Sequence, residues 1–421
     1  AEGSGDWSRL NVNFVTSVPK REFESHRGRN MLLQHFEVLT LESFGCEEKP
    51  LAIGAAAAIL GYVSDTQPTV INQVYTLKTY SLDSFMTMDA QSRRNLELFE
   101  GGRWGERGAS LLATLDCTIT PMGARLIRGW MGQPLLDLDT LEQRQEVVTF
   151  FLDRMLKRRD TRDILSKVSD LERIIGRISL GRSTPRDLLS MKESLKAVSV
   201  LLDLLSPDSQ SLRSVMSDIK PFDDLVLLIE ASINEETSGN IGEGDVIKEG
   251  FSNDLDVLRS GAKDARNFIA GLERKEREST GIKSLKVGHN RIFGYYIEVR
   301  NSSLAQVPDD YVRRQTLANG ERYVTPELKE YESLIMNARA CIAEIEKNIY
   351  SQVCNQISQQ SRGIIAISGA IASLDVLVCF AESASIRGYT KPSLLSEGPL
   401  DIKGGRHPIV ERILSSGTFV P

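Results

Sequence analysis

Apolar residues recur with helical spacing along two long segments of the chain. The first seam has members three or four positions apart: Phe251, Leu255, Leu258, Ala262, Ala265, Ile269 and Leu272. The second has the same spacing: Ile335, Ala338, Ile342, Ile345, Ile349, Val353 and Ile357. Such seams are typical of paired helices, and no proline interrupts residues 327–391. Helices over 248–280 and 331–360 would each extend roughly 45–50 Å, so we predict two antiparallel arms of similar length.

The segment between the arms, residues 284–331, has the composition of β-strands. Its β-branched and aromatic residues include Ile292, Tyr295, Ile297, Val299, Tyr311, Val312, Tyr323 and Val324. Residues of this kind favour strands. A chain that runs out along one arm and returns along the other carries the intervening segment at the tip. We therefore predict a small β-rich unit at the end of a helical hairpin.

The rest of the chain has a mainly helical pattern. We predict helices over Arg27–Phe36 and Leu51–Ser64, a helical region from Ser81 to about Asp245, and a strand over Asn11–Val18. A chain of 421 residues is too long for a single core, so at least two structural units are expected. The predicted fold class is mainly α, with a helical core, a long antiparallel two-helix arm carrying a small β-rich tip, and partial α/β pieces at both ends.

The tip segment is more basic than the chain as a whole. Residues 286–323 contain six lysine and arginine residues and four acidic residues, whereas the whole chain has a net charge of −6. The run VRRQTLANGERY at 312–323 combines arginine, asparagine, glutamine and tyrosine, side chains that contact nucleic-acid phosphates. A tip that is merely solvated remains the alternative interpretation of these charges.

Several long motifs resemble the MutS family of DNA mismatch repair proteins. They are FMTMDAQSRRNLELFE at 85–100, SLLATLDCTITPMGARLIRGWMGQPL at 110–135, RIFGYYIEV at 291–299, YVRRQTLANGERYVTPELKEYE at 311–332, SLDVLVCFAESA at 373–384 and GRHPIVE at 405–411. The resemblance implies these regions: the C-terminal part of the connector domain at 1–77, the helical core at 78–246, lever helices at 247–283 and 332–386, the clamp at 284–331, and the beginning of the ATPase domain at 387–421. In that family the clamp holds the DNA backbone.

The resemblance also implies individual site residues. By position, the candidate phosphate contacts are Arg313, Arg314, Asn319 and Arg322. Phe419 matches a family position whose aromatic side chain packs on the adenine of the nucleotide. The family often has Lys-Asn-Ala where this chain has Ala-Asn-Gly at 318–320, so one expected cationic contact is missing.

No catalytic or metal site is evident in the sequence. Neither Gly-Lys-Ser nor Gly-Lys-Thr occurs, so the Walker A phosphate loop is missing. The glycine-rich loop at 238–245 resembles a phosphate cradle, but its acidic residues would repel phosphate, and we interpret it as a linker. The four histidines lack partners at metal-ligand spacing, and no Gly-x-Ser-x-Gly motif indicates a serine nucleophile.

The resemblance implies a fragment of a MutS-like mismatch repair protein that has no enzymatic activity or cofactor of its own. Its clamp would bind the backbone of double-stranded DNA, and its lever would couple the clamp to the ATPase. The intact protein would be a DNA-dependent ATPase using ATP, ADP and Mg²⁺, forming a homodimer on mismatched DNA and recruiting a MutL-type partner. The mismatch-reading element is missing from the chain. A coiled-coil structural or partner-binding protein and a recombination-type MutS paralogue remain alternatives.

Cysteine usage and the apolar pattern predict a cytoplasmic protein without membrane association. The five cysteines are odd in number and widely spaced, which indicates reduced thiols. The first residues lack a basic region followed by an apolar run, so no signal peptide is expected. We also expect no apolar stretch of about 18 residues that would span a membrane.

The purified chain is predicted not to hydrolyse ATP, because its sequence shows no Walker A motif, no metal cluster and no constellation of residues that would activate a nucleophile. An assay of inorganic phosphate, run with and without duplex DNA, checks this. Phosphate release above the buffer blank contradicts it.

Overall fold

The structure is a computed structural model that describes residues 18–71, 84–100, 110–205, 210–237, 239–290 and 294–413 and the single positions 74, 77 and 79. The chain divides into two compact units. The first comprises Ala1–Arg182, Glu193–Asp223 and Ile357–Pro421, and the second comprises Ser183–Lys192 and Asp224–Gln356. The described residues are mainly helical and their named strands form one antiparallel sheet, which confirms the predicted fold class. The predicted strand at 11–18 lies outside the described residues except for its last position.

The first unit is built from helices of short and medium length. These are α1 (Ser25–Phe36), α2 (Pro50–Thr66), α3 (Pro68–Ile71), α4 (Ala90–Asn95), α5 (Leu111–Leu115), α6 (Pro121–Gly132), α7 (Leu138–Asp153), α8 (Met155–Leu165), α9 (Leu171–Ser179), α11 (Gln210–Met216), α15 (Ser361–Arg387) and α16 (Pro408–Ile413), with 3₁₀ turns η2 (Lys20–Phe23) and η3 (Glu42–Phe44). α10 (Pro185–Leu204) begins in the second unit and ends in the first. The helices predicted over Arg27–Phe36 and Leu51–Ser64 are confirmed as α1 and α2.

Helix α15 forms the centre of the first unit, where α6, α7, α8 and α9 pack against it. It contains an 18-residue window of mean hydropathy 2.3, long and apolar enough to cross a membrane. The expectation that no such stretch exists was therefore wrong. Because 72% of that window is buried inside the protein, its apolar residues are those of a core helix surrounded by other helices.

A buried carboxylate on α15 holds the start of α6. Asp375 Oδ2 accepts hydrogen bonds from the backbone N–H and the hydroxyl of Thr120, both at 2.7 Å, and Asp375 also accepts from the N–H of Ile119. The Thr120 hydroxyl in turn accepts from the N–H of Gly123 at 3.0 Å, which caps the helix ahead of Pro121. A side chain at Gly123 would collide with the Asp375 carboxylate. The helix start and the core helix are thus fixed to each other.

The second unit contains the predicted arms. They are α13 (Asn253–Thr280) and α14 (Pro326–Gln359), and α12 (Asp223–Ser232) precedes them. The Thr325 hydroxyl accepts from the N–H of Leu328 at 3.1 Å and Pro326 occupies the first turn, so α14 begins five residues before the predicted helix start at 331. Gln360, with φ −96° and ψ 8°, separates α14 from α15. The segment 332–386 therefore contains two helices.

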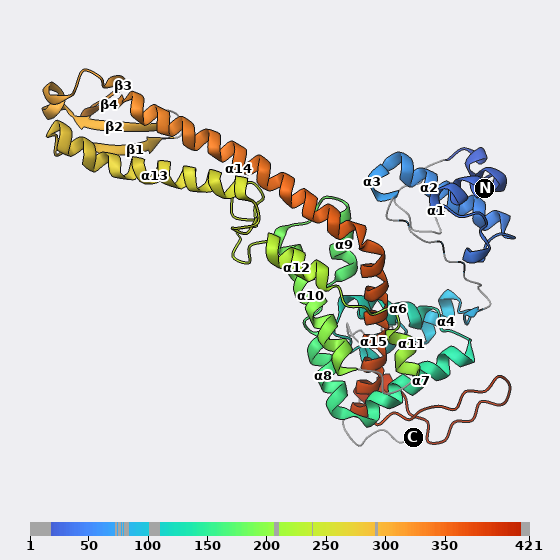
Figure 1. Ribbon diagram of the computed structural model, residues 1–421. Coiled ribbons are helices and arrows are strands. Elements are labelled where there is room, and N and C mark those ends of the chain that lie inside the picture. The colour runs from blue at the N-terminus through green and yellow to red at the C-terminus, as the bar shows by residue number, and fades with distance from the viewer. Residues whose placement is uncertain are drawn as a thin grey trace. The chain divides into compact units, whose positions relative to one another are not determined.

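A four-stranded antiparallel sheet, here called the tip sheet, lies between the ends of α13 and α14 (Figure 1). Its strands are β1 (Lys286–Asn290), β2 (Gly294–Arg300), β3 (Val312–Leu317) and β4 (Gly320–Val324), in the order β1-β2-β4-β3, and η5 (Asn301–Gln306) follows β2. One cluster of buried residues joins arms and sheet: Ala265, Ile269, Leu272, Ile282, Leu285, Ile297, Val299, Tyr311, Tyr323, Leu328 and Ile335. The predicted seams therefore meet each other and the sheet within one chain.

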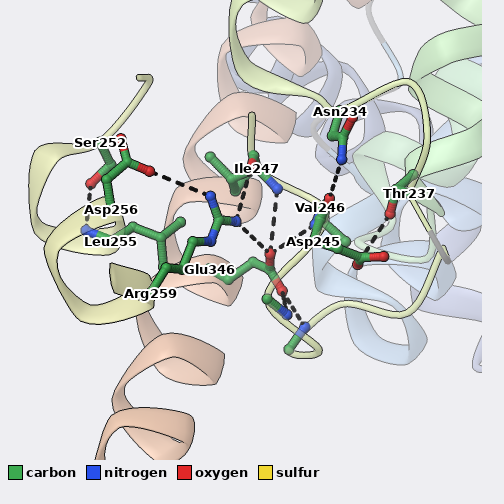
Figure 2. A network of polar contacts seen from close by, with 12 residues as sticks. Asn234, Thr237, Asp245, Val246, Ile247, Ser252, Leu255, Asp256, Arg259 and Glu346 are labelled. Carbon is green, nitrogen blue, oxygen red and sulfur yellow. Dashed lines mark hydrogen bonds and ion pairs between the residues drawn. The ribbon is translucent and has the colours of Figure 1, made fainter. Parts of the chain in front are cut away.

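The two arms are also joined through a loop by one buried carboxylate, that of Glu346 on α14 (Figure 2). Its Oε2 accepts from the N–H groups of Gly242 and Gly244 at 2.8 and 2.9 Å. Its Oε1 accepts from Val246 at 2.8 Å and more weakly from Ile247 at 3.3 Å. Glu346 is fully buried, so these amides replace the water that a carboxylate would otherwise bind.

Arg259 on α13 completes this network. Its Nη2 lies 3.4 Å from Oε1 of Glu346 and donates to the carbonyl oxygen of Ile247 at 2.8 Å. Nη1 lies 3.5 Å from Oδ1 of Asp256. One guanidinium therefore connects α13 to the loop and to the carboxylate of α14.

The glycine-rich loop is therefore more than the linker that was predicted. Gly242 and Gly244 have φ values of 99° and 90°, a conformation that side chains other than glycine rarely adopt. This conformation turns successive amides toward a single anion. The anion is the carboxylate of Glu346, so the cradle is filled by the chain itself.

Replacing Glu346 by glutamine is predicted to destabilise the second unit by about 3–5 kcal/mol, because it breaks a buried charged network and leaves Arg259 with the Asp256 carboxylate, 3.5 Å away, as its remaining acidic partner. Amide hydrogen exchange at Gly242, Gly244 and Val246 measures the opening of the loop directly. The matched control is Glu344→Gln, which removes the same charge from an exposed position of the same helix. Equal exchange in both variants contradicts the role given to Glu346.

Candidate nucleic-acid interface

The tip sheet buries one face and exposes the other. Ile297, Val299 and Tyr323 are buried in the cluster shared with the arms. Side chains alternate along a strand. Glu298 lies between Ile297 and Val299, and Arg322 is next to Tyr323, so both lie on the outer face, where they pair with each other. This outer face is available to a ligand.

A row of polar side chains crosses the outer face. Its members are directly opposite one another on β1, β2, β4 and β3: Lys286, Glu298, Arg322 and Gln315. Nε of Arg322 donates to Oε2 of Glu298 at 3.1 Å, and its Nη1 donates to Oε1 of Gln315 at 3.0 Å. The guanidinium also lies 4.1 Å from the ring centroid of Tyr296, a favourable cation–π geometry. Only 19% of the Arg322 side chain is exposed, so it is strongly engaged within the sheet.

Arg313 has an internal partner but remains largely accessible. Its Nη1 lies 3.1 Å from Oε1 of Glu321, and 63% of its side chain is exposed. The Tyr323 hydroxyl donates to the other oxygen of Glu321 at 2.6 Å. This hydrogen bond, with the charge of Arg313, lowers the pKa of Glu321, whereas burial and Glu321 raise the pKa of Tyr323 to about 12. Exposed ion pairs are weak, so Arg313 can exchange this carboxylate for a phosphate.

Arg314 occupies a β-bulge on the edge strand. Arg313 pairs with Tyr323 and Gln315 pairs with Arg322, which leaves Arg314 as the extra residue of β3. Bulges of this kind redirect a side chain away from the regular ladder. The side chain is exposed, and within the part of the chain that the structure describes it has no hydrogen bond, ion pair or ring contact. It therefore has no internal partner to release before it binds an anion.

Asn319 lies in the two-residue turn between β3 and β4, next to Ala318, and both residues are exposed. The backbone N–H of Asn301 donates to the carbonyl oxygen of Asn319, and its side-chain amide donates to that of Ala318, both at 3.2 Å. The backbone of the turn is therefore held while its side chains remain accessible. The β3–turn–β4 hairpin carries all four predicted phosphate contacts.

The residues that hold the tip sheet on the arms have no recognisable signal in the sequence. The Tyr311 hydroxyl donates to Oε2 of Glu276 on α13 at 2.6 Å, and burial raises the pKa of Tyr311. Oε1 of Glu332 on α14 accepts from the N–H of Tyr295 at 3.0 Å. Gly294, at φ 73°, lies so close to Glu332 that a side chain there would collide with it. In the sequence, both glutamates are ordinary charged positions of helices, and no spacing indicated these contacts.

Two further predictions concern a nucleotide contact and metal sites. Phe419 lies outside the described residues. Among the residues that are described, no group of histidine, cysteine, aspartate or glutamate side chains is arranged to hold a metal ion. The site that the described residues form is therefore a polar, partly cationic surface.

Comparison with known proteins gives two matching family models. The model described as MutS domain III matches residues 91–381, and the model described as MutS domain II matches residues 5–75. The DNA mismatch repair protein MutS of Dehalococcoides mccartyi (strain ATCC BAA-2266 / KCTC 15142 / 195) is 42% identical over 400 residues, 94% of this chain and 46% of that protein. The MutS proteins of Halothermothrix orenii and Symbiobacterium thermophilum are each 39% identical over 97% of this chain and 46% and 47% of their own lengths.

The chain thus spans about half the length of the curated relatives it matches. The domain III match alone extends over most of the chain and contains both arms and the tip sheet. On these matches, with the motifs quoted above, the chain belongs to the MutS family of DNA mismatch repair proteins.

Proposed function

We propose that the tip sheet is a clamp that contacts the sugar–phosphate backbone of double-stranded DNA, through Arg314 first and Arg313, Asn319 and Arg322 around it. The observation that carries this proposal is the exposed guanidinium of Arg314 on the bulge, which has no partner among the described residues. Phosphate contacts position a protein on DNA without reading its sequence. This surface would therefore bind DNA without discriminating between paired and mismatched bases.

Arg322 has a different part in this proposal from that of Arg314. Its bonds to Glu298 and Gln315 fix the outer face of the sheet. An arginine held in this way presents its remaining N–H groups in a fixed direction, which lowers the entropic cost of binding a phosphate. Arg314 supplies an accessible charge, and Arg322 supplies rigidity.

In the longer protein, α13 and α14 would be the lever that couples the clamp to an ATPase. Two packed helices joined by the apolar cluster and by the Glu346 network can move as one rigid body. By family membership, we further propose that the intact cytoplasmic protein is a homodimer that binds mismatched DNA, uses ATP, ADP and Mg²⁺, and acts with a MutL-type partner. Phe419 would then contribute to the nucleotide site.

The coiled-coil alternative is less well supported. It requires the seam between Phe251 and Leu272 to be open to a second helix. In the second unit, Ile269 and Leu272 of this seam pack against Leu328 and Ile335 and against the tip sheet of the same chain. The relatives, which are all named as DNA mismatch repair proteins, likewise favour repair over a recombination-type paralogue.

Replacing Arg314 by alanine is predicted to weaken duplex binding and to reduce the slope of log K against log salt concentration by about one unit, because one phosphate contact is lost. Fluorescence anisotropy of a labelled duplex at several salt concentrations measures both. The control is Arg339→Ala, which removes the same charge from an exposed position of α14. The proposal fails if Arg314→Ala and the parent give superimposable curves, or if the control has the same effect.

Adding a cation at the turn is predicted to strengthen binding. Ala318 is exposed beside Asn319, so Ala318→Lys places a charge next to the proposed contacts and should steepen the salt slope by up to about one unit. The gain should be the same for perfectly paired and mismatched duplexes, since phosphates carry no base information. The comparison variant Ala318→Gln has similar length without charge. Identical behaviour of lysine and glutamine at 318 contradicts an electrostatic role for this turn.

A further inference from the structure

Two cysteines far apart in the sequence lie side by side in the first unit. All five cysteines are free thiols. The Sγ atoms of Cys117 and Cys379 are 3.4 Å apart, and the backbone N–H of Cys117 points at Sγ of Cys379 at 3.2 Å. Cys117 precedes α6, whereas Cys379 is buried on α15. The two sulfur atoms are thus in direct contact although 262 positions separate them.

The surroundings of the two thiols are unequal. Cys117 is only partly buried. Arg162 on α8 donates from Nη1 to the carbonyl oxygen of Cys117 at 3.0 Å, and the Ser383 hydroxyl lies 3.5 Å from its sulfur. The negative charges near the pair belong to Asp116 and to Glu382 on α15.

These surroundings shift the pKa values of the two thiols in opposite directions. The hydrogen bond with the Cys379 thiol, helped by Ser383 and by the charge of Arg162, lowers the pKa of Cys117 to about 6 in spite of its burial. The same hydrogen bond and burial raise the pKa of Cys379. With its greater exposure and its lowered pKa, Cys117 is the better nucleophile of the two thiols.

We propose that Cys117 and Cys379 form an oxidation site that converts to a disulfide when the protein meets a peroxide, with Cys117 as the attacking thiolate and Cys379 as the resolving thiol. No other pair of described cysteines has sulfur atoms in hydrogen-bond contact. Cys341 is exposed and has no cysteine partner. Cys354 is buried, and its sulfur contacts the Ser183 hydroxyl at 3.5 Å.

The chemistry balances with hydrogen peroxide as the oxidant. The Cys117 thiolate attacks one peroxide oxygen, the O–O bond breaks, and hydroxide leaves, so that Cys117 becomes a sulfenic acid. The sulfur of Cys379, as it loses its proton, then attacks the sulfur of Cys117. The S–S bond forms and the sulfenic oxygen leaves as water. Two electrons pass from the thiol pair to the peroxide, and a dithiol such as dithiothreitol returns them.

The disulfide would reinforce an existing contact between α15 and the segment that precedes α6. Asp375 and Cys379 lie one turn apart on α15, and both hold the stretch from Cys117 to Thr120, Asp375 through hydrogen bonds to Ile119 and Thr120. A disulfide there closes a long loop and restricts the unfolded chain. Oxidation should therefore raise the thermal midpoint of the first unit by several degrees. The salt dependence of DNA binding should not change, because the tip sheet is in the second unit.

The test uses the whole chain with hydrogen peroxide, followed by alkylation of free thiols and non-reducing peptide mapping by mass spectrometry. We expect the number of free thiols to fall from five by two, the cross-linked peptides to contain Cys117 and Cys379, and dithiothreitol to reverse both changes. Cys341→Ala and Cys354→Ala should keep the cross-link. Retention of all five thiols, or a cross-link through Cys341, overturns the proposal.

Two further measurements identify the roles of the two sulfurs. The rate of Cys117 alkylation by iodoacetamide in the parent chain should rise with pH about a midpoint near 6, and Arg162→Gln should move that midpoint upward. In Cys379→Ala the oxidised Cys117 should remain a sulfenic acid that dimedone traps. Should that variant fail to fold, the pH profile of the parent still decides, because a midpoint near the ordinary thiol value of about 8.5 overturns the assignment of Cys117 as the thiolate.

Discussion

Among the described residues of the second unit, Glu346 has the one buried carboxylate, and the glycine-rich loop, α13 and α14 all meet at it. A charge removed from water in this way would cost several kcal/mol if its hydrogen-bonding capacity were not filled. The amides of the glycine-rich loop and the guanidinium of Arg259 fill it. The loop, α13 and α14 are thereby fixed at one point. Closer to the tip, the arms meet in the apolar cluster that they share with the sheet, and Glu276 and Glu332 bind the sheet directly.

At the tip sheet, in contrast to the Glu346 site, one charge is compensated within the protein and another is left exposed to solvent. Arg322 is compensated inside the sheet by Glu298 and Gln315, whereas Arg314 is left exposed on the bulge. A chain of net charge −6 repels DNA at long range, but salt limits that repulsion to a Debye length of about 8–10 Å. Under the proposed function, the exposed cations of the tip sheet would therefore act on phosphates over that short distance. Rigidity of the support and accessibility of the charge are separate requirements, met by different arginines.

The sequence was sufficient for features that depend on periodicity and local propensity. The seams of α13 and α14 and the strand character of β2 follow directly from residue spacing and type. It was insufficient where a side chain meets a distant backbone. Glu346 sits between Ile345 and Ile349 of the seam like any polar helix position, and only folding brings the loop amides to it. The acidic residues of that loop suggested that it repels anions. Its amides nevertheless bind one, because their direction depends on φ values that the sequence does not state.

From the sequence alone, Arg314 and Arg322 are equivalent candidates for phosphate contacts. What separates them is the register of β3 against β4, in which one extra residue changes the side that a side chain faces. The long apolar run of α15 was overlooked for a related reason, since it is interrupted by serines and an aspartate that are satisfied inside the core. Contacts across hundreds of positions, such as Asp375 with Thr120, leave no periodic trace in either partner.

The geometry of the Glu346 cradle also limits how this part of the chain can change in length. The four amides that meet the carboxylate come from Gly242, Gly244, Val246 and Ile247. Inserting or deleting one residue among them would shift half of the donors out of phase with the two oxygens, whatever residue was chosen. Surface loops normally accommodate such changes at little cost. This loop should instead be as intolerant of insertions as a core helix.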